Sequence, residues 1–227
     1  MIQFENLTAI QKRTLKLYPN YKLFYNDLSP ARLLVAYDNI NTIEESIAKP
    51  RMTIEDINII YPETEINNSV NYIARWLDFL NKFSNINKQL TELNAVAYMI
   101  YKDYKFMYLT DLKIIFEKIM RAEYGPFYGS VDAQRILYGF MQYNLERSIL
   151  TRKQRDKYNL DLEDHLDKTR NSVSLEILKI MKKDFNDIEG QDYWEKRKDF
   201  ENKMMPVALK NAREEFLNKY LEEHAPN

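Results

Sequence analysis

The chain has 227 residues, with 33 Lys and Arg against 34 Asp and Glu, no Cys, 4 Gly and 7 Pro. The formal net charge of -1 gives no overall attraction to nucleic acid or to an anionic membrane, and the lack of Cys excludes disulfides, thiolate metal sites and cysteine nucleophiles. Glycine this scarce argues against sandwiches, barrels and phosphate-binding loops, which need it at tight turns, and it predicts an all-α fold.

The first third of the chain shows short helical segments. The sequence predicts a helix over residues 5–17. Ser29 and Pro30 predict a second helix start, because serine is a common cap and proline suits the first helical position. Thr42 and Thr53 each precede an acidic residue three positions later, which is the pattern of a capping box. We therefore expect an irregular but helical N-terminal third.

Longer helices follow, because apolar residues then recur at spacings of three and four. The predicted starts lie near Ser69, Thr91, Thr110 and Val131. Residues 70–147 are expected to form the core. The side chains expected to be buried there are Trp76, Leu80, Val96, Ile115, Phe116, Ile136 and Phe140.

An aromatic turn, residues 124–132 with the sequence YGPFYGSVD, separates the last two of these helices. Gly125 is expected to end the preceding helix in the left-handed region, and Ser130 to cap the next one. The turn also supplies candidate protein-contact residues, with packing between the flanking helices as the alternative. These candidates are Tyr124, Phe127 and Tyr128.

The composition changes near residue 150. Residues 151–227 are far richer in charge than residues 1–150, so we expect a helical body over 1–150 and a charged helical extension over 151–227. The extension should contain long helices over about 150–186 and 191–223, broken near Glu189-Gly190.

The final helix carries Pro206, which should kink or divide it. A segment so charged is expected to form no core of its own. Its aromatic side chains should therefore pack onto the body or onto another subunit, which makes Trp194, Phe200 and Phe216 further protein-contact candidates.

Groups suited to catalysis are few. The two histidines, His165 and His224, are not at metal-ligand spacing, and the carboxylates near His165 fit a solvated helix face better than a metal site. No glycine-rich phosphate loop and no serine-hydrolase elbow is present. We expect no enzyme activity, no cofactor and no bound metal. The apolar runs are also too short to predict a membrane span.

A basic run between Tyr143 and Tyr158 is the main candidate for nucleic-acid contact, because cations can bind phosphates while aromatics stack on bases. The alternative, which we favour, is the ordinary polar face of a charged helix, since Asp156 lies within the run. The cations concerned are Arg147, Arg152, Lys153, Arg155 and Lys157.

Three segments together form a distinctive pattern: Leu109–Phe116 with its Leu-Thr-Asp start, the aromatic turn, and Tyr143–Arg147. This pattern resembles a helical family of gut-bacterial (crAss-like) phages and prophages with a YGxxY-x-x-x-D turn. The match covers roughly residues 60–150, and no catalytic residues are assigned to the family.

The resemblance implies a non-enzymatic virion structural protein, most simply a neck or ring subunit of the head-tail connector type. Such a protein would be made in the host cytoplasm and assemble with itself, and with portal or tail components, in the virion. The near balance of charges would let copies pair side by side. The alternative is a DNA-replication accessory protein of the helicase-loader kind, which would bind a helicase and DNA.

Overall fold

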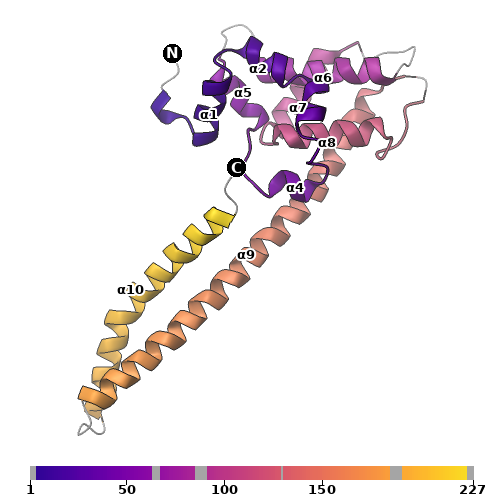
Figure 1. Cartoon of the computed structure of the whole chain (residues 1–227). Coiled ribbons are helices and arrows are strands. Elements are labelled where there is room, and N and C mark those ends of the chain that lie inside the picture. The colour runs from indigo at the N-terminus through magenta and orange to yellow at the C-terminus, as the bar shows by residue number, and fades with distance from the viewer. Residues whose placement is uncertain (1–3, 63–66, 85–90, 129, 185–190, 224–227) are drawn as a thin grey trace. The chain divides into compact units, whose positions relative to one another are not determined.

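A computed structural model describes residues 4–62, 67–84, 91–128, 130–184 and 191–223 (Figure 1). These residues form helices and no sheet strand, so the expected all-α fold is confirmed. None of the described helices combines the length and the apolar character that crossing a membrane requires. The chain divides into two compact units, Met1–Leu150 and Thr151–Asn227, here named the body and the extension.

The N-terminal part of the body consists of short helices, most of which begin with a side-chain cap. The helix that starts at Pro30 is the exception, because the Ser29 side chain makes no cap hydrogen bond. Thr42 Oγ1 accepts a hydrogen bond from the Glu45 amide at 3.2 Å, and the Glu45 carboxylate accepts one from the Thr42 amide at 2.9 Å, so this capping box is confirmed. Thr53 and Asp56 form a second one. The helices are α1 (Ala9–Leu17), α2 (Tyr21–Asp27), α3 (Pro30–Ala36), α4 (Ile43–Ile47) and α5 (Ile54–Ile60), after a short 3-10 turn at Phe4–Asn6.

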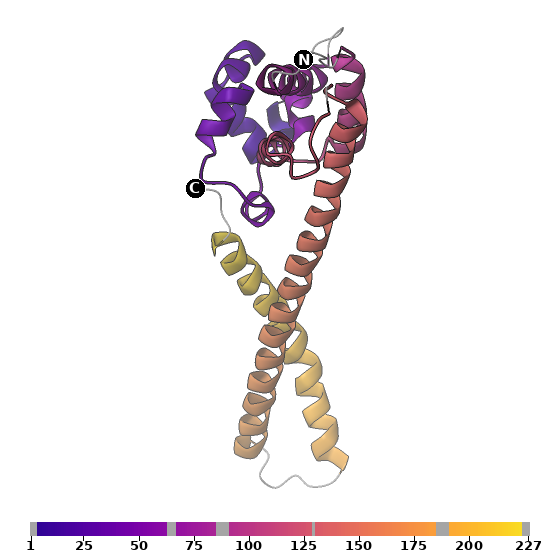
Figure 2. The same ribbon diagram turned by 90° about the vertical axis from the view of Figure 1, so that its right-hand side faces the viewer.

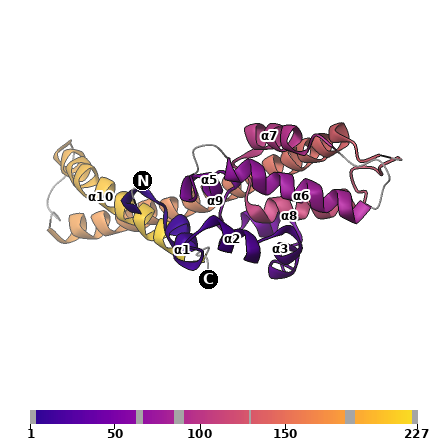
Figure 3. The ribbon, with the colours of Figure 1, turned by 90° about the horizontal axis from the view of Figure 1, so that it is seen from above.

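Helix α6 (Asn68–Ser84) is the helix around which the body packs. It contacts α3, α5, α7 (Leu93–Tyr104) and α8 (Leu109–Met120), as Figure 3 shows from above. Trp76 of α6 stacks on Phe116 of α8 with ring centroids 4.9 Å apart, and Phe140 meets Phe116 edge-on at 5.9 Å. All seven side chains expected in the core are buried.

The core is wider than residues 70–147, because the short N-terminal helices contribute to it. Phe24 of α2 is fully buried, and its ring lies 5.5 Å from that of Tyr61 and 5.7 Å from that of Tyr72. Tyr72 and Tyr61 donate their hydroxyls to backbone carbonyls of Leu28 and Tyr18, both at 2.5 Å. Two of the 17 tyrosines thus have a structural role, since each combines a buried ring with a hydroxyl that is hydrogen-bonded.

The end of α8 differs from the expectation. Ala122, not Gly125, is the residue in the left-handed region after this helix, with φ of 59°. The amides of Ala122 and Glu123 donate to the carbonyls of Ile119 and Lys118 at 3.0 and 2.9 Å, which is the hydrogen-bond pair of a Schellman motif. Gly125 does have a positive φ, 96°, but it lies beyond this cap.

Helix α9 (Ala133–Asp184) begins in the body and continues into the extension, so the expected helix start near residue 150 is wrong. Its cap is Asp132 rather than Ser130, because the Asp132 carboxylate accepts a hydrogen bond from the Gln134 amide at 2.8 Å. Helix α10 (Gln191–Glu223) continues through Pro206 and is not divided there. The expected break at Glu189-Gly190 lies outside the described residues.

Within the extension, α9 and α10 run antiparallel and pack on each other (Figure 2). Tyr158 contacts Phe216 and Tyr220, with ring centroids 5.4 and 4.7 Å apart. Further along, Phe200 packs against a buried cluster of Val173, Ile177 and Met181. The extension therefore has a small core of its own, which corrects the expectation that it could form none.

Candidate functional site

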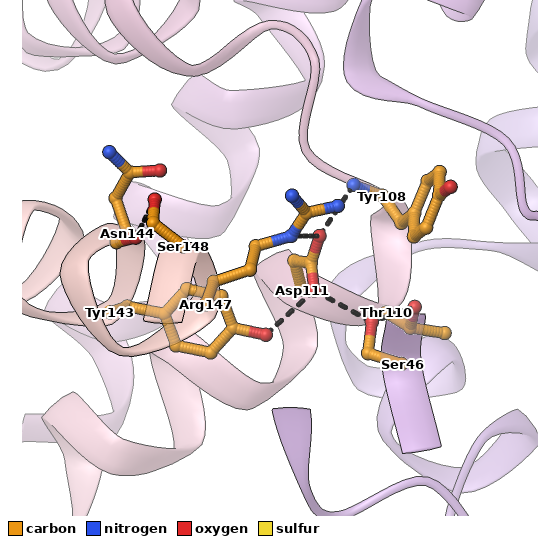
Figure 4. A network of polar contacts seen from close by, with 8 residues as sticks. All are labelled: Ser46, Tyr108, Thr110, Asp111, Tyr143, Asn144, Arg147 and Ser148. Atoms are coloured by element: carbon orange, nitrogen blue, oxygen red, sulfur yellow. Dashed lines mark hydrogen bonds and ion pairs between the residues drawn. The ribbon is translucent and has the colours of Figure 1, made fainter. Parts of the chain in front are cut away.

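The most elaborate polar site of the body surrounds Asp111, which has no exposed surface (Figure 4). Asp111 is the third residue of α8, so its carboxylate reaches back to the Tyr108 amide at 2.9 Å as a helix cap does. Ser46 of α4 donates its hydroxyl to Oδ1 at 2.7 Å, and Tyr143 of α9 donates to the same oxygen at 2.7 Å. Arg147 Nε donates to Oδ2 at 3.0 Å.

Arg147 is held by aromatic rings as well as by the carboxylate. Its guanidinium carbon lies 5.3 Å from the Tyr108 ring centre and 5.8 Å from that of Phe106, and its side chain is only 15% exposed. Tyr143 and Arg147 are four residues apart, so they project from the same side of α9 toward Asp111. Burial raises the pKa of the Tyr143 phenol, and the Asp111 charge and hydrogen bond raise it further.

A second buried charge lies two residues further along α8. Lys113 is 1% exposed, and its Nζ donates to the Ile40 carbonyl at 2.8 Å and to Asn41 Oδ1 at 3.0 Å. The Glu117 carboxylate is 3.2 Å away. Lys113 therefore fastens the segment before α4 to α8, as Ser46 does from within α4.

These contacts give the Asp111 site a structural role: it holds α4, α8 and α9 together. Each Asp111 oxygen accepts two hydrogen bonds, so the carboxylate has no lone-pair direction left for a substrate proton. Catalytic bases need such access to the group they deprotonate. No group of three or more His, Asp and Glu side chains that could hold a metal occurs in the described part of the chain.

The candidate nucleic-acid contacts fall into two groups. Arg147 is paired with Asp111, Tyr143 is buried, and the half-buried Tyr158 packs on Phe216, so these three make contacts within the chain. The remaining four cations are exposed on the extension: Arg152, Lys153, Arg155 and Lys157.

The three candidate contact residues of the aromatic turn differ in how deeply their side chains are buried. Tyr124 is half-buried with Lys118 Nζ 5.5 Å from its ring centre, and burial raises the pKa of its phenol to about 12. Phe127 is half-buried against the core. Tyr128 is 81% exposed, so it is the member of the turn that is free for an outside contact.

The extension candidates also divide. Phe200 and Phe216 face the neighbouring helix of the same chain, and Phe216 additionally lies 5.6 Å from the His165 ring. Trp194 is 60% exposed, with the Arg197 guanidinium 5.4 Å from its ring centre. Of the three, Trp194 alone presents most of its ring to the outside.

The sequence places Asp111, Tyr143 and Arg147 in one pattern but did not predict that their side chains contact one another. The i,i+4 spacing of Tyr143 and Arg147, with a carboxylate at the third position of another helix, was an available signal. Ser46 and Lys113 gave no such signal, because serine and lysine side chains are mostly exposed to solvent.

The chain matches no protein-family model, and no curated protein and no solved structure matches it.

Proposed function

We propose that the protein is a non-enzymatic assembly subunit of a phage virion, of the neck or ring (head-tail connector) type, that binds other copies and neighbouring portal or tail proteins. The observation that carries this proposal is the exposure of large aromatic side chains on both units, Tyr128 on the body and Trp194 on the extension. Exposed aromatics of this size are enriched where proteins bind proteins. The resemblance of residues 60–150 to a phage family supplies the virion context.

The charged groups of the body support the same proposal. Asp111 and Lys113 are the charged side chains that the described body buries, and both are fully engaged in holding helices together. The buried charges thus stabilise the fold, and the exposed aromatics remain available to bind other proteins. This combination suits a subunit of a larger assembly.

The native mass of the purified protein, measured by light scattering, and mass spectrometry of purified particles test the proposal. We expect an oligomer and a stoichiometric virion component. Tyr128→Ala and Trp194→Ala should weaken assembly, whereas Leu17→Ala and Leu175→Ala, which truncate side chains that are 62% and 60% exposed elsewhere, should not. A monomer that is absent from particles would contradict the proposal.

One observation favours the alternative, a replication accessory protein of the helicase-loader kind: the four exposed cations at Arg152, Lys153, Arg155 and Lys157. Such a cluster should bind single-stranded DNA with a strong salt dependence. Fluorescence anisotropy with Lys153→Gln and Arg155→Gln tests this function. The matched control is Lys203→Gln, because Lys203 is an exposed lysine already paired with Asp199 at 2.6 Å. Binding that these two variants abolish and the control retains would support the alternative.

A further inference from the structure

The part of α9 that belongs to the body is apolar on two opposite sides. Ile136, Phe140 and Tyr143 are fully buried in the core. On the other side, four large apolar side chains are about half-exposed at spacings of three, four and four. They are Tyr138 (47%), Met141 (49%), Leu145 (57%) and Ile149 (50%), here named the outer stripe.

Helical geometry sets the two sides opposite each other. Successive residues turn by about 100°, so the outer stripe spans roughly 80° of the helix, and its centre lies about 175° from the centre of the buried set. A helix that packs on one side of a core normally presents polar residues on the opposite side. A continuous apolar stripe there indicates a surface that is covered in the working state.

The charge pattern indicates which occupant fits. Residues 136–145 contain no charged side chain, whereas the chain as a whole is 30% charged. Between there and Ile149 the charged side chains are Glu146 and Arg147, which are paired with Lys118 and Asp111 of the same chain. In a contact between identical faces every charge would approach its own copy or a close neighbour, so a charge-free face is the kind that pairs with itself without repulsion. Tyr, Met, Leu and Ile also pack well in such contacts.

The surface beside the stripe adds a shape argument. A groove of about 420 Å³ between α4 and α9 opens next to the last stripe residue, lined by the apolar side chains of Ile43, Ile149 and Leu150 and by polar groups that include the Lys118–Glu146 ion pair. The first stripe residue, Tyr138, is the bulkiest. When two copies of the stripe pair antiparallel about its centre, Tyr138 of each copy comes to lie opposite Ile149 of the other, beside the groove.

We propose that the outer stripe of α9 binds a second copy of the chain through the same stripe, antiparallel, as a two-fold symmetric dimer in which each Tyr138 packs beside the other copy's groove. This contact does not require a place in a virion, so it stands or falls separately from the proposed function.

Sedimentation of the full chain across a range of concentrations tests whether the stripe pairs. Leu145→Glu introduces an unpaired charge into the contact and should raise the dimer dissociation constant by about tenfold or more. Leu160→Glu is the matched control, because Leu160 is a 72% exposed leucine of the same helix outside the stripe. Tyr138→Ala removes the side chain that packs beside the other copy's groove in the proposed dimer, so it should also weaken the dimer. Circular dichroism verifies that each variant is folded.

Cross-linking tests the symmetry, and the natural absence of Cys makes single-cysteine variants clean. Leu145→Cys lies near the two-fold axis and should form a disulfide with its own copy on oxidation. Tyr138→Cys lies at one end, where rise along the helix separates it from its own copy by about 16 Å. It should instead cross-link to Ile149→Cys in a mixture of the two variants.

A chain that stays monomeric at every concentration, or a dimer unaffected by Leu145→Glu, overturns the proposal. Cross-links that form only between unlike positions without the Leu145 self-pair also overturn it, because they would indicate a head-to-tail contact. That last outcome would leave a ring possible, so failure of this dimer and failure of the proposed function are distinguishable.

Discussion

Asp111 and Arg147 form a buried ion pair whose two members come from different helices. The Asp111 carboxylate has no exposed surface, and Arg147 Nε is 3.0 Å from it. Removing one partner of such a pair leaves the other charge buried and uncompensated, which costs about 3–5 kcal/mol. We therefore expect Arg147→Ala to lower the free energy of unfolding by about that amount in urea titrations.

Arg155→Ala provides the comparison for Arg147→Ala, because Arg155 lies on the same helix but is exposed. It should change the free energy of unfolding by less than about 0.5 kcal/mol. Equal effects of the two substitutions would show that the Asp111 contacts do not fasten α9 to α8.

Tyr143 should make the body sensitive to alkali. Burial, together with Asp111, raises the pKa of its phenol above the ordinary value of 10.0, so the folded state favours the neutral form. The stability contributed by this group is complete below pH 10.0 and is lost as the pH rises from there toward the folded-state pKa. Burial raises the pKa values of Tyr61 and Tyr72 in the same direction.

Near-ultraviolet absorbance of tyrosinate, recorded together with circular dichroism, measures this sensitivity. We expect the three buried tyrosines to ionise only as the helices unfold. Tyr143→Phe should lower stability at neutral pH by about 1–3 kcal/mol, since Asp111 loses a donor, and it should flatten the alkaline part of the stability curve. Complete tyrosine titration of a still-folded protein would contradict the burial of these phenols.

The sequence predicted individual residues of the Asp111 site but not their contact. Asp111 and Arg147 are 36 positions apart, and neither a capping pattern nor an apolar period reports which helices meet. Core residues such as Trp76 and Phe116 were predictable, because burial follows from periodicity alone. The buried Lys113 was not predictable, since its burial depends on the Ile40 carbonyl and the Asn41 side chain, 73 and 72 positions away, as well as on the Glu117 carboxylate.

Helix starts with a capping box were predicted correctly, whereas the cap expected at Ser130 and the end expected for α8 were not. Thr42 and Thr53 cap as expected because a threonine followed by an acidic residue at the third position makes two local hydrogen bonds. The end of α8 was misplaced, because alanine occupies a position that usually selects glycine. The small core of the extension was not predicted for a related reason. It forms because α9 and α10 pack together, and local sequence patterns do not report contacts between residues far apart in the chain.

The two residues with positive φ near the end of α8 give a matched pair of substitutions. Ala122 has a φ of 59°, where a side chain is strained, so Ala122→Gly should raise the free energy of unfolding by about 1 kcal/mol. Gly125 has a φ of 96°, and a Cβ there would clash with Arg135 Nη1. Gly125→Ala should therefore lower stability by about 1 kcal/mol or more.

Thermal and urea unfolding of both variants, at neutral pH, measures this pair. Gly125→Ala should also disturb the hydrogen bond from Arg135 to the Tyr124 carbonyl, 3.3 Å long, because the guanidinium must move. Opposite signs for the two substitutions would locate the strain at Ala122. A destabilising Ala122→Gly would mean that the alanine methyl group makes contacts worth more than the strain.

The body and the extension bury very different amounts of apolar surface. One buried cluster in the body extends from Leu7 to Tyr143, whereas the corresponding cluster described in the extension consists of Val173, Ile177 and Met181 with partly buried neighbours. Hydrophobic burial is the main favourable term in folding. The two units are therefore expected to differ in local stability, even though α9 belongs to both.

Hydrogen exchange of the intact protein measures that difference. Amides of α6 and α8 should exchange at least about tenfold more slowly than those of α10, because opening the extension exposes less apolar surface than opening the body. Equal protection of all three helices in the monomer would mean that the chain unfolds as one cooperative unit. On assembly, added protection over residues 136–150 is expected if the outer stripe pairs with itself. Added protection over α10 is expected if Trp194 is the contact, since an interface slows exchange most in the helix that it covers.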